Sequence, residues 1–238
     1  IGTDAFDEFM IENKLYDKVY KMESNSQLET DFLNASLPES LIKSLKAFLK
    51  QVKYPLAVRS SSLLEDSQYQ PLAGMYSTLM IQNSDKNNKN RLNQLSEAVK
   101  RVYASTFFKD LHSITSISRH HYTEEKMAIL ITELIGQNHG NRFYPTLSGI
   151  AQNVNYYPVS YAERNDGVAT IALGFGRTVV EGEKSLRFTP KYPAILPQFY
   201  SIRSTEENTQ STFYALNTNP SVDPLSGGEE TNLTKYSL

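Results

Sequence analysis

The sequence has no cysteine and no tryptophan among its 238 residues. Without cysteine, the chain cannot form disulfides, thiolate zinc sites or a thiol nucleophile. The absence also fits a reducing compartment, and we expect a cytoplasmic protein. No apolar run approaches the roughly 20 residues that a membrane-spanning helix needs. The longest run, at residues 127–135, is interrupted by Thr132 and Glu133, so we expect no membrane partner.

An excess of charge of one sign is also missing. Lysine and arginine number 24 against 26 aspartate and glutamate residues, which gives a formal net charge of −2. No basic field would attract nucleic acid, so we expect no nucleic-acid partner. The hydrophobic fraction of 39% is enough for one large domain or two small ones. Because the chain begins with Ile1 rather than methionine, we expect it to be a piece of a longer protein.

What the sequence does contain is an unusual polar stretch at residues 57–78. A short apolar run ends in Arg59, which is followed by serines at 60–62, by two carboxylates and by Gly74. A guanidinium group offers a planar fork of donors to phosphate oxygens. Serine hydroxyls and backbone N–H groups can add donors, and a glycine lets the backbone approach a ligand closely. The stretch is typical of an anion site at the end of a strand.

Other interpretations of single residues stay open at this point. The arginine is equally explained as a surface side chain that pairs with Glu65 or Asp66, since the stretch has no Walker-type G-x-x-x-x-G-K pattern. Gly174 and Gly176 form either a phosphate loop or a tight turn. Glu133 is either buried beside a partner or ligand, or exposed at the end of its strand.

Hydrophobic spacing predicts mainly helices in the first half and strands in the second. We expect a polar connection at 24–30 and a hairpin turn at 165–167 that joins two strands. The helices are expected at 4–22, 38–52 and 91–108, and the strands at 56–58, 76–81, 127–131, 147–154, 159–163 and 168–173. This pattern predicts an α+β fold with two lobes. A helix-rich N-terminal lobe would span 1–125, a C-terminal lobe with a mostly antiparallel sheet 126–215, and an extended or disordered tail 216–238.

Several short stretches in a fixed order carry a family resemblance. They are VRSSS at 58–62 with ED at 65–66, AGM at 73–75 through Thr78, AVKRVYAS at 98–105, MAILITELI at 127–135, SGIA at 148–151, and LGFG at 173–176 followed by VV at 179–180 and Gly182. Together they resemble the nucleotide-binding domain of the phosphoenolpyruvate synthase and pyruvate phosphate dikinase family, which has an ATP-grasp fold. The resemblance covers about residues 3–188.

The resemblance implies a kinase-type phosphotransferase with ATP and Mg²⁺ as cofactors. In this family, ATP binds between two lobes, and phosphoryl passes to a histidine on a separate domain elsewhere in the full-length chain. By this resemblance Arg59, as a catalytic residue, would hold the ATP phosphates, the loop at 72–78 would cover them, and backbone groups at 133–135 would bind the adenine. The implied nucleotide-binding residues are Arg59, Ser60, Ser61, Gly74, Thr78, Glu133, Leu134, Ile135 and Lys184.

The sequence also departs from the family pattern. Thr170 and Arg177 stand where the family usually has carboxylates, so ligands for Mg²⁺ are missing there. Glu163, Glu181 and Glu183 are the candidate replacements, and the family's glycine-rich G-G-K-G segment would precede the first residue. A second interpretation is therefore a catalytically degenerate nucleotide-binding or regulatory module that keeps the fold without turnover. A third is an unrelated interaction domain whose match is a coincidence.

Overall fold

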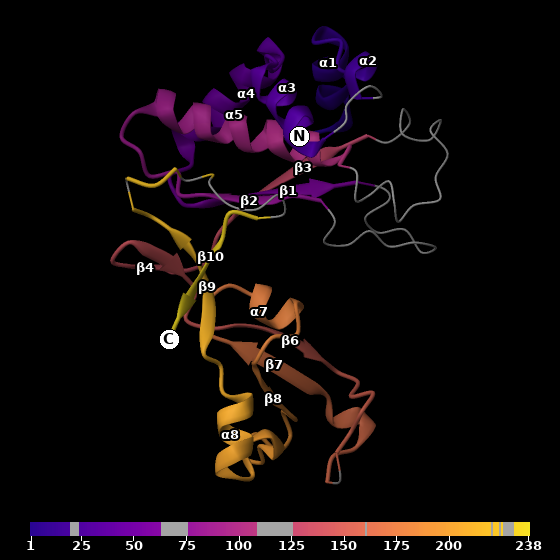
Figure 1. The fold of residues 1–238 in the computed structure, drawn as a ribbon, viewed down its shortest axis with the longest axis vertical. Helices are drawn as coiled ribbons and strands as arrows, with labels where there is room; N and C mark the ends of the chain where they lie inside the picture. Colours follow the sequence, from indigo (N-terminus) through magenta and orange to yellow (C-terminus); the bar gives the residue numbers. More distant parts are fainter. Residues whose placement is uncertain are drawn as a thin grey trace. The chain divides into compact units, whose positions relative to one another are not determined.

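The computed structural model describes residues 1–19, 24–62, 76–108, 126–159, 161–219, 221–223, 225 and 231–238. These residues form two compact units, drawn in Figure 1. The first comprises Ile1–Leu134 and Pro220–Asn232, and the second comprises Ile135–Asn219 and Leu233–Leu238. The sequence placed the division at 125/126, whereas the units divide after Leu134. The difference arises because strand β3 (Ala128–Glu133) pairs with a strand of the first unit.

The described helices of the first unit are α1 (Thr3–Glu12), α2 (Tyr16–Val19), α3 (Asn25–Asn34), α4 (Glu39–Gln51) and α5 (Asn88–Ser105). The helices predicted at 38–52 and 91–108 are confirmed as α4 and α5. The single helix predicted at 4–22 is wrong, because α1 ends where Lys14 adopts a φ of 52°. The polar connection predicted at 24–30 is also wrong. Ser24 is an N-cap whose Oγ accepts the Gln27 N–H at 3.3 Å, so these polar residues begin α3.

An aromatic cluster holds the helices of the first unit together. The rings of Phe6 and Tyr103 lie 5.0 Å apart in an edge-to-face arrangement, and those of Phe9 and Phe32 lie 5.8 Å apart. All four side chains are fully or almost fully buried. Such ring pairs contribute beyond the apolar area that they bury. The cluster therefore joins α1, α3 and α5 into one layer.

This helical layer covers one face of a three-stranded antiparallel sheet with the order β2-β1-β3 (Figure 1). Strand β1 is Leu56–Ser61 and β2 is Thr78–Ile81. In β1, Leu56 and Val58 are buried beneath the helices, whereas Arg59 and Ser61 are exposed. Successive side chains of a strand point to opposite faces. The face that carries Arg59 is therefore the one without helices.

The second unit contains two antiparallel sheets, with the orders β10-β9-β5-β4 and β6-β7-β8. The strands are β4 (Gln137–His139), β5 (Arg142–Tyr144), β6 (Ser148–Gln152), β7 (Val168–Ala172), β8 (Leu186–Phe188), β9 (Thr212–Asn217) and β10 (Thr234–Ser237). Short helices α7 (Arg177–Val180) and α8 (Ile202–Asn208) and 3-10 turns η1 (Arg164–Asp166) and η2 (Pro197–Phe199) complete it. The predicted α+β fold with two lobes and an antiparallel C-terminal sheet is confirmed.

Two local expectations for the second unit are corrected. The described residues of 159–163 form no strand, and 164–166 form a 3-10 turn instead of a hairpin turn. The reason is a capping box in which the Glu163 N–H donates to the Asp166 carboxylate at 2.8 Å. The hairpin partner of β7 is β6. In the region predicted as a tail, residues 234–237 form β10, which pairs with β9. None of the described helices is long and apolar enough to cross a membrane.

Candidate functional site

Arg59 lies on the face of the first sheet that the described helices leave uncovered. Its Cα partners are Thr78 on β2 and Leu130 on β3. Residues directly opposite each other in an antiparallel pair have side chains on the same face, so Arg59 and Thr78 are neighbours there. No described carboxylate forms an ion pair with Arg59. Glu65 and Asp66, the partners in the alternative interpretation, lie outside the described residues, so that alternative stays open.

The strand alternation separates the three serines that follow. Ser60 and Ser62 are each 8% exposed and lie on the opposite face from Arg59, and the Ser62 hydroxyl donates to the Tyr76 hydroxyl at 3.4 Å. Ser61 is exposed and shares the face of Arg59. The Ser61 hydroxyl, and not that of Ser60, therefore lies on the same face as the guanidinium group. Gly74, with the rest of 63–75, lies outside the described residues.

The residues predicted to meet the adenine begin at the other end of the same strand pair. Glu133 is the Cα partner of Leu56, and the Leu134 N–H donates to the Pro55 carbonyl at 2.9 Å. Position 59 lies three residue steps along the strand from position 56, which is a rise of about 10 Å. The Leu134 N–H is thus used within the sheet. The Glu133 side chain is exposed at the end of β3, as one of the two sequence interpretations expected.

Ile135 and Lys184 belong to the second unit. The Ile135 side chain is 73% exposed. The Lys184 ammonium is exposed, and its one described contact is a long hydrogen bond of 3.4 Å to the Glu206 carbonyl. Since no described carboxylate neutralises it, this cation is available to an anionic ligand.

Two carboxylates of the second unit, which were candidate metal ligands, are engaged by cations. The Arg177 guanidinium forms an ion pair with Glu181. The Lys235 Nζ lies 2.6 Å from Glu183 Oε1, and the Tyr214 hydroxyl donates to the same oxygen at 2.8 Å. The Arg177 and Lys235 cations lie 5.2 and 5.4 Å from the Tyr214 ring centroid, within the range of cation–π attraction. Each of these two carboxylates is therefore paired with a cation.

The protonation of this cluster follows from its hydrogen bonds. The bond from Lys235 lowers the pKa of the Glu183 carboxyl below its usual value, and the same bond raises the pKa of Lys235. Burial, followed by the hydrogen bond to Glu183, raises the pKa of the Tyr214 hydroxyl. At neutral pH, Glu183 is therefore an anion that already accepts two hydrogen bonds.

The described residues do not fit a magnesium ion. Mg²⁺ prefers carboxylate oxygens and water in an octahedral arrangement. No group of three or more histidine, aspartate or glutamate side chains among the described residues is placed to hold a metal ion. Thr170 lies on β7 opposite Ile150 and Arg187, so a cation rather than a carboxylate is its neighbour. Sequence reasoning missed Lys235 as the partner of Glu183, because 52 residues separate them and no local pattern joins them.

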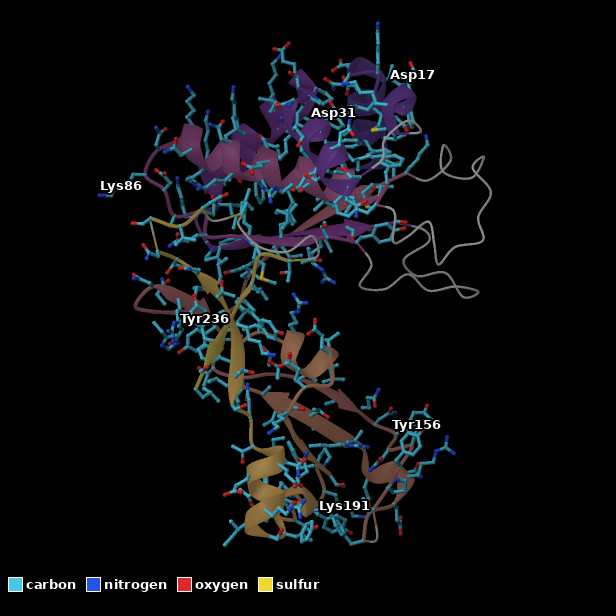
Figure 2. All side chains as sticks on the ribbon, viewed as in Figure 1. Asp17, Asp31, Lys86, Tyr156, Lys191 and Tyr236 are labelled. Atoms are coloured by element: carbon cyan, nitrogen blue, oxygen red, sulfur yellow. The ribbon has the colours of Figure 1, made fainter. Side chains whose placement is uncertain are left out.

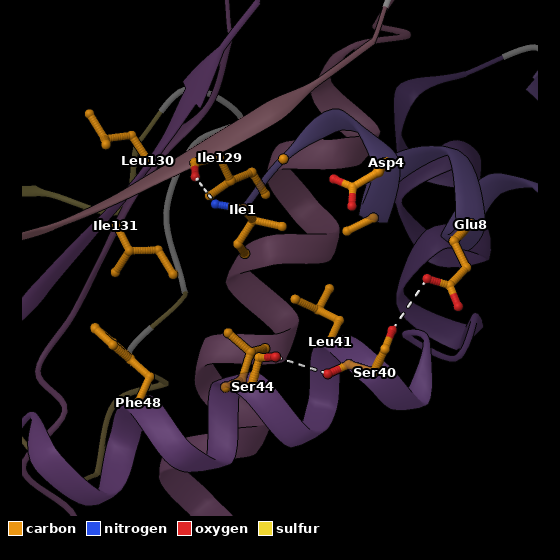
Figure 3. A pocket seen from close by; sticks show the side chains of 13 residues that line it. Ile1, Asp4, Glu8, Ser40, Leu41, Ser44, Phe48, Ile129, Leu130 and Ile131 are labelled. Carbon is orange, nitrogen blue, oxygen red and sulfur yellow. Dashed lines mark hydrogen bonds between the residues drawn. The ribbon is translucent and has the colours of Figure 1, made fainter.

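The first unit also contains a cavity of about 560 Å³ between α1, α4 and the outer edge of β3 (Figure 3). Ser40 donates to the Glu8 carboxylate at 3.3 Å, and the Ile1 ammonium donates to the Ile129 carbonyl at 2.8 Å. Asp4 and Glu8 line this cavity, so its charge disfavours a phosphate-bearing ligand. None of the predicted site residues lines it.

The described residues thus place an exposed arginine beside hydroxyls on one face of a sheet, in an α+β chain of two units. Such donors suit phosphate oxygens. The family model described as "Pyruvate phosphate dikinase, AMP/ATP-binding domain" matches residues 1–222. The chain belongs to this family and is a nucleotide-binding domain of it. The family match excludes the third interpretation, an unrelated interaction domain. A search of curated proteins found no match to the chain.

Proposed function

We propose that this chain is an ATP-grasp domain that binds ATP through its first sheet. Arg59 holds the phosphates, with the hydroxyls of Ser61 and Thr78 beside it. Backbone groups of Glu133 and Ile135 that the sheet leaves unused hydrogen-bond the adenine. Lys184 contributes a second cation. In this proposal the domain belongs to a longer cytoplasmic phosphotransferase of the phosphoenolpyruvate synthase or pyruvate phosphate dikinase type.

The observation that carries the proposal is the exposed guanidinium group of Arg59 on the open face of β1, in a chain whose family binds AMP or ATP. Along the strand pair, the backbone of Arg59 lies about 10 Å from the position opposite Glu133, so one extended ligand can contact both ends. In the full-length protein, phosphoryl would pass from ATP to a histidine on another domain. Such transfer depends mostly on positioning and on electrostatic stabilisation of the phosphates.

The second candidate function is nucleotide binding without turnover, as in a degenerate or regulatory module. The Arg177–Glu181 and Lys235–Glu183 pairs favour it. A divalent cation would have to displace both cations before it met these carboxylates. When bound, Mg²⁺ supplies charge neutralisation of the phosphates. In this candidate, arginine and lysine side chains neutralise the charge of the phosphates instead.

Calorimetric titration of the chain with ATP, with Mg²⁺ and with a chelator, tests both candidates. Arg59→Ala should weaken binding at least tenfold, because a charge-assisted hydrogen bond to phosphate is lost. Arg203→Ala is the matched control, since Arg203 is exposed on α8 and pairs with Glu207. Binding that needs Mg²⁺ favours the phosphotransferase, and binding indifferent to Mg²⁺ favours the degenerate module. If ATP does not bind, or if the two arginine variants weaken it equally, the proposal is wrong.

A further inference from the structure

The second unit contains a cavity of about 250 Å³ that none of the proposed nucleotide residues lines. It lies in the part of the unit that carries Tyr156 and Lys191 in Figure 2. Its apolar wall includes the aromatic rings of Tyr157, Tyr161 and Phe188. A mostly apolar concave site with a few polar groups is the usual form of a small-molecule site.

Two buried polar side chains line this cavity with donors that no described residue uses. Asn155 is 3% exposed, and its Oδ1 accepts the Tyr157 N–H at 3.1 Å and meets an Arg187 nitrogen at 3.5 Å. Its NH₂ group donates to none of the described residues. Thr189 is also 3% exposed, and its hydroxyl has no hydrogen bond within the described parts of the chain. Neither the Asn155 amide nitrogen nor the Thr189 hydroxyl is among the buried polar atoms that lack a partner. Both donors are therefore open to the cavity, where an acceptor atom of a ligand can meet them.

The charges around the cavity indicate which kind of acceptor group fits it. The exposed Arg187 guanidinium forms no ion pair with a carboxylate of the described residues, and its long contact with Asn155 leaves most of its donors unused. No aspartate or glutamate lines the cavity. A planar fork of charged donors beside neutral amide and hydroxyl donors matches a carboxylate group. The aromatic wall matches an apolar or aromatic body.

Hydrogen bonds hold the walls in place. The Gln198 side-chain oxygen accepts the backbone N–H of Arg187 at 2.8 Å, and its side-chain nitrogen donates to the Ser185 carbonyl at 3.1 Å. These two bonds tie η2 to the outer edge of β8. The Tyr161 hydroxyl donates to the Ile195 carbonyl at 3.1 Å. A cavity whose walls are already ordered loses less conformational entropy when a ligand enters.

We propose that this cavity binds a small monocarboxylate that carries a single aromatic ring or an apolar group of similar size. The carboxylate accepts hydrogen bonds from Arg187, the Asn155 amide and the Thr189 hydroxyl. The ring packs against Tyr157, Tyr161 and Phe188. None of the residues proposed to hold the nucleotide lines this cavity.

Phenylacetate is the probe, and titration of the whole chain by ligand-observed NMR and calorimetry is the measurement. We expect a dissociation constant in the millimolar range or tighter, given the size of the probe. Phenylacetamide has the same shape without the charge and should bind about tenfold more weakly or worse, and benzylamine should not bind.

Three variants locate the site. Arg187→Gln should weaken phenylacetate at least tenfold, and Arg203→Gln, on α8 of the same unit, should not. Asn155→Asp keeps the oxygen that accepts the Tyr157 N–H, but it replaces the donor by a negative charge, so binding should be lost. Thr189→Val removes the hydroxyl at nearly constant volume. If Asn155→Asp unfolds the chain, Thr189→Val replaces it as the test of the site.

Three outcomes would overturn the proposal: no binding of phenylacetate at millimolar concentration, equal binding of phenylacetate and phenylacetamide, or equal weakening by Arg187→Gln and Arg203→Gln. ATP titration of the same variants keeps the two proposals apart. Arg187→Gln should leave ATP affinity unchanged, and Arg59→Ala should leave phenylacetate affinity unchanged.

Discussion

The side-chain amide of Asn232 forms two hydrogen bonds with the backbone of Met80, although 152 residues separate them. The Met80 N–H donates to Asn232 Oδ1 at 2.8 Å, and Asn232 Nδ2 donates to the Met80 carbonyl at 2.6 Å. Because β2 is an edge strand, these backbone groups would otherwise lack a strand partner. The asparagine therefore takes the place of a neighbouring strand beside Met80.

Replacing Asn232 by leucine should expose the edge of β2. We expect the free energy of unfolding to fall by about 1–3 kcal/mol and the Met80 amide to exchange faster with solvent, since two hydrogen bonds are lost. Denaturant unfolding and hydrogen exchange are the measurements. Asn93→Leu, at an exposed position on α5, is the control and should change stability by less than about 0.5 kcal/mol. Equal effects of the two variants would show that the pair contributes nothing.

Arg91 should be essential for the stability of the first unit. It is 1% exposed and donates to Asn83 Oδ1 at 2.8 Å, to the Leu49 carbonyl at 2.9 Å and also to the Val52 carbonyl. The last two carbonyls belong to the C-terminal end of α4, where a cation is favoured. Arg91→Met removes the donors to both carbonyls and leaves the Val52 carbonyl only a longer bond of 3.3 Å from the Asn83 amide. The variant should cost about 1–3 kcal/mol in denaturant unfolding. Arg91→Lys keeps the charge but loses the planar set of guanidinium donors, so we expect an intermediate loss of stability.

Tyr103→Phe should stabilise the chain. The side chain is fully buried, burial raises the pKa of its hydroxyl above the usual value, and the hydroxyl has no hydrogen-bond partner among the described residues. Removing a buried hydroxyl that lacks a partner should raise the free energy of unfolding by about 1 kcal/mol. Tyr54→Phe, at a partly exposed ring, should change nothing. A loss of stability in Tyr103→Phe would reveal a partner for the hydroxyl.

The Glu183–Lys235 pair should make stability depend on pH. The hydrogen bond from Lys235 lowers the pKa of Glu183 from 4.5, so the pair contributes stability above pH 4.5, and this contribution is lost as pH falls through the lower pKa of the folded state. Thermal unfolding at neutral pH should therefore occur at a lower temperature in Glu183→Gln than in the parent chain. The difference should vanish in acid.

At alkaline pH, the contribution of the pair to stability should change with pH in the opposite direction. Because the bond raises the pKa of Lys235 above 10.5, its contribution is present below that pH and is lost as pH rises through the higher value of the folded state. Lys235→Gln should remove the same dependence as Glu183→Gln, and the double variant should add little to either. Additive effects would mean that the two side chains act independently.

The serines next to Arg59 should behave differently from each other. Ser61→Ala should weaken ATP binding about three- to tenfold, because a hydrogen bond to a charged group is lost. Ser60→Ala should leave the affinity unchanged, since Ser60 lies on the helix-covered face. Calorimetric titration of both variants measures this. A larger effect from Ser60→Ala than from Ser61→Ala would contradict the proposed phosphate contact.

Local patterns in the sequence were enough to predict α4, α5, β1 and β3. Apolar residues recur there at the spacing of a helix face or of a buried strand. The same patterns failed at 24–30, because a polar run that begins a capped helix is difficult to distinguish from a loop. They failed again at 159–163, where strand-like residues have no neighbouring strand, since β6 and β8 take both edges of β7.

By itself, the sequence determined the α+β class, the family, and the position of Arg59 at the end of a buried strand, because these depend on short patterns and their order. The tertiary structure decided which serine shares the face of Arg59, since pairing with β2 and β3 orients that strand. It also decided the partners of Met80 and Glu183, which lie 152 and 52 residues away along the chain. Contacts at such separations leave no local pattern, and only the folded chain brings these residues together.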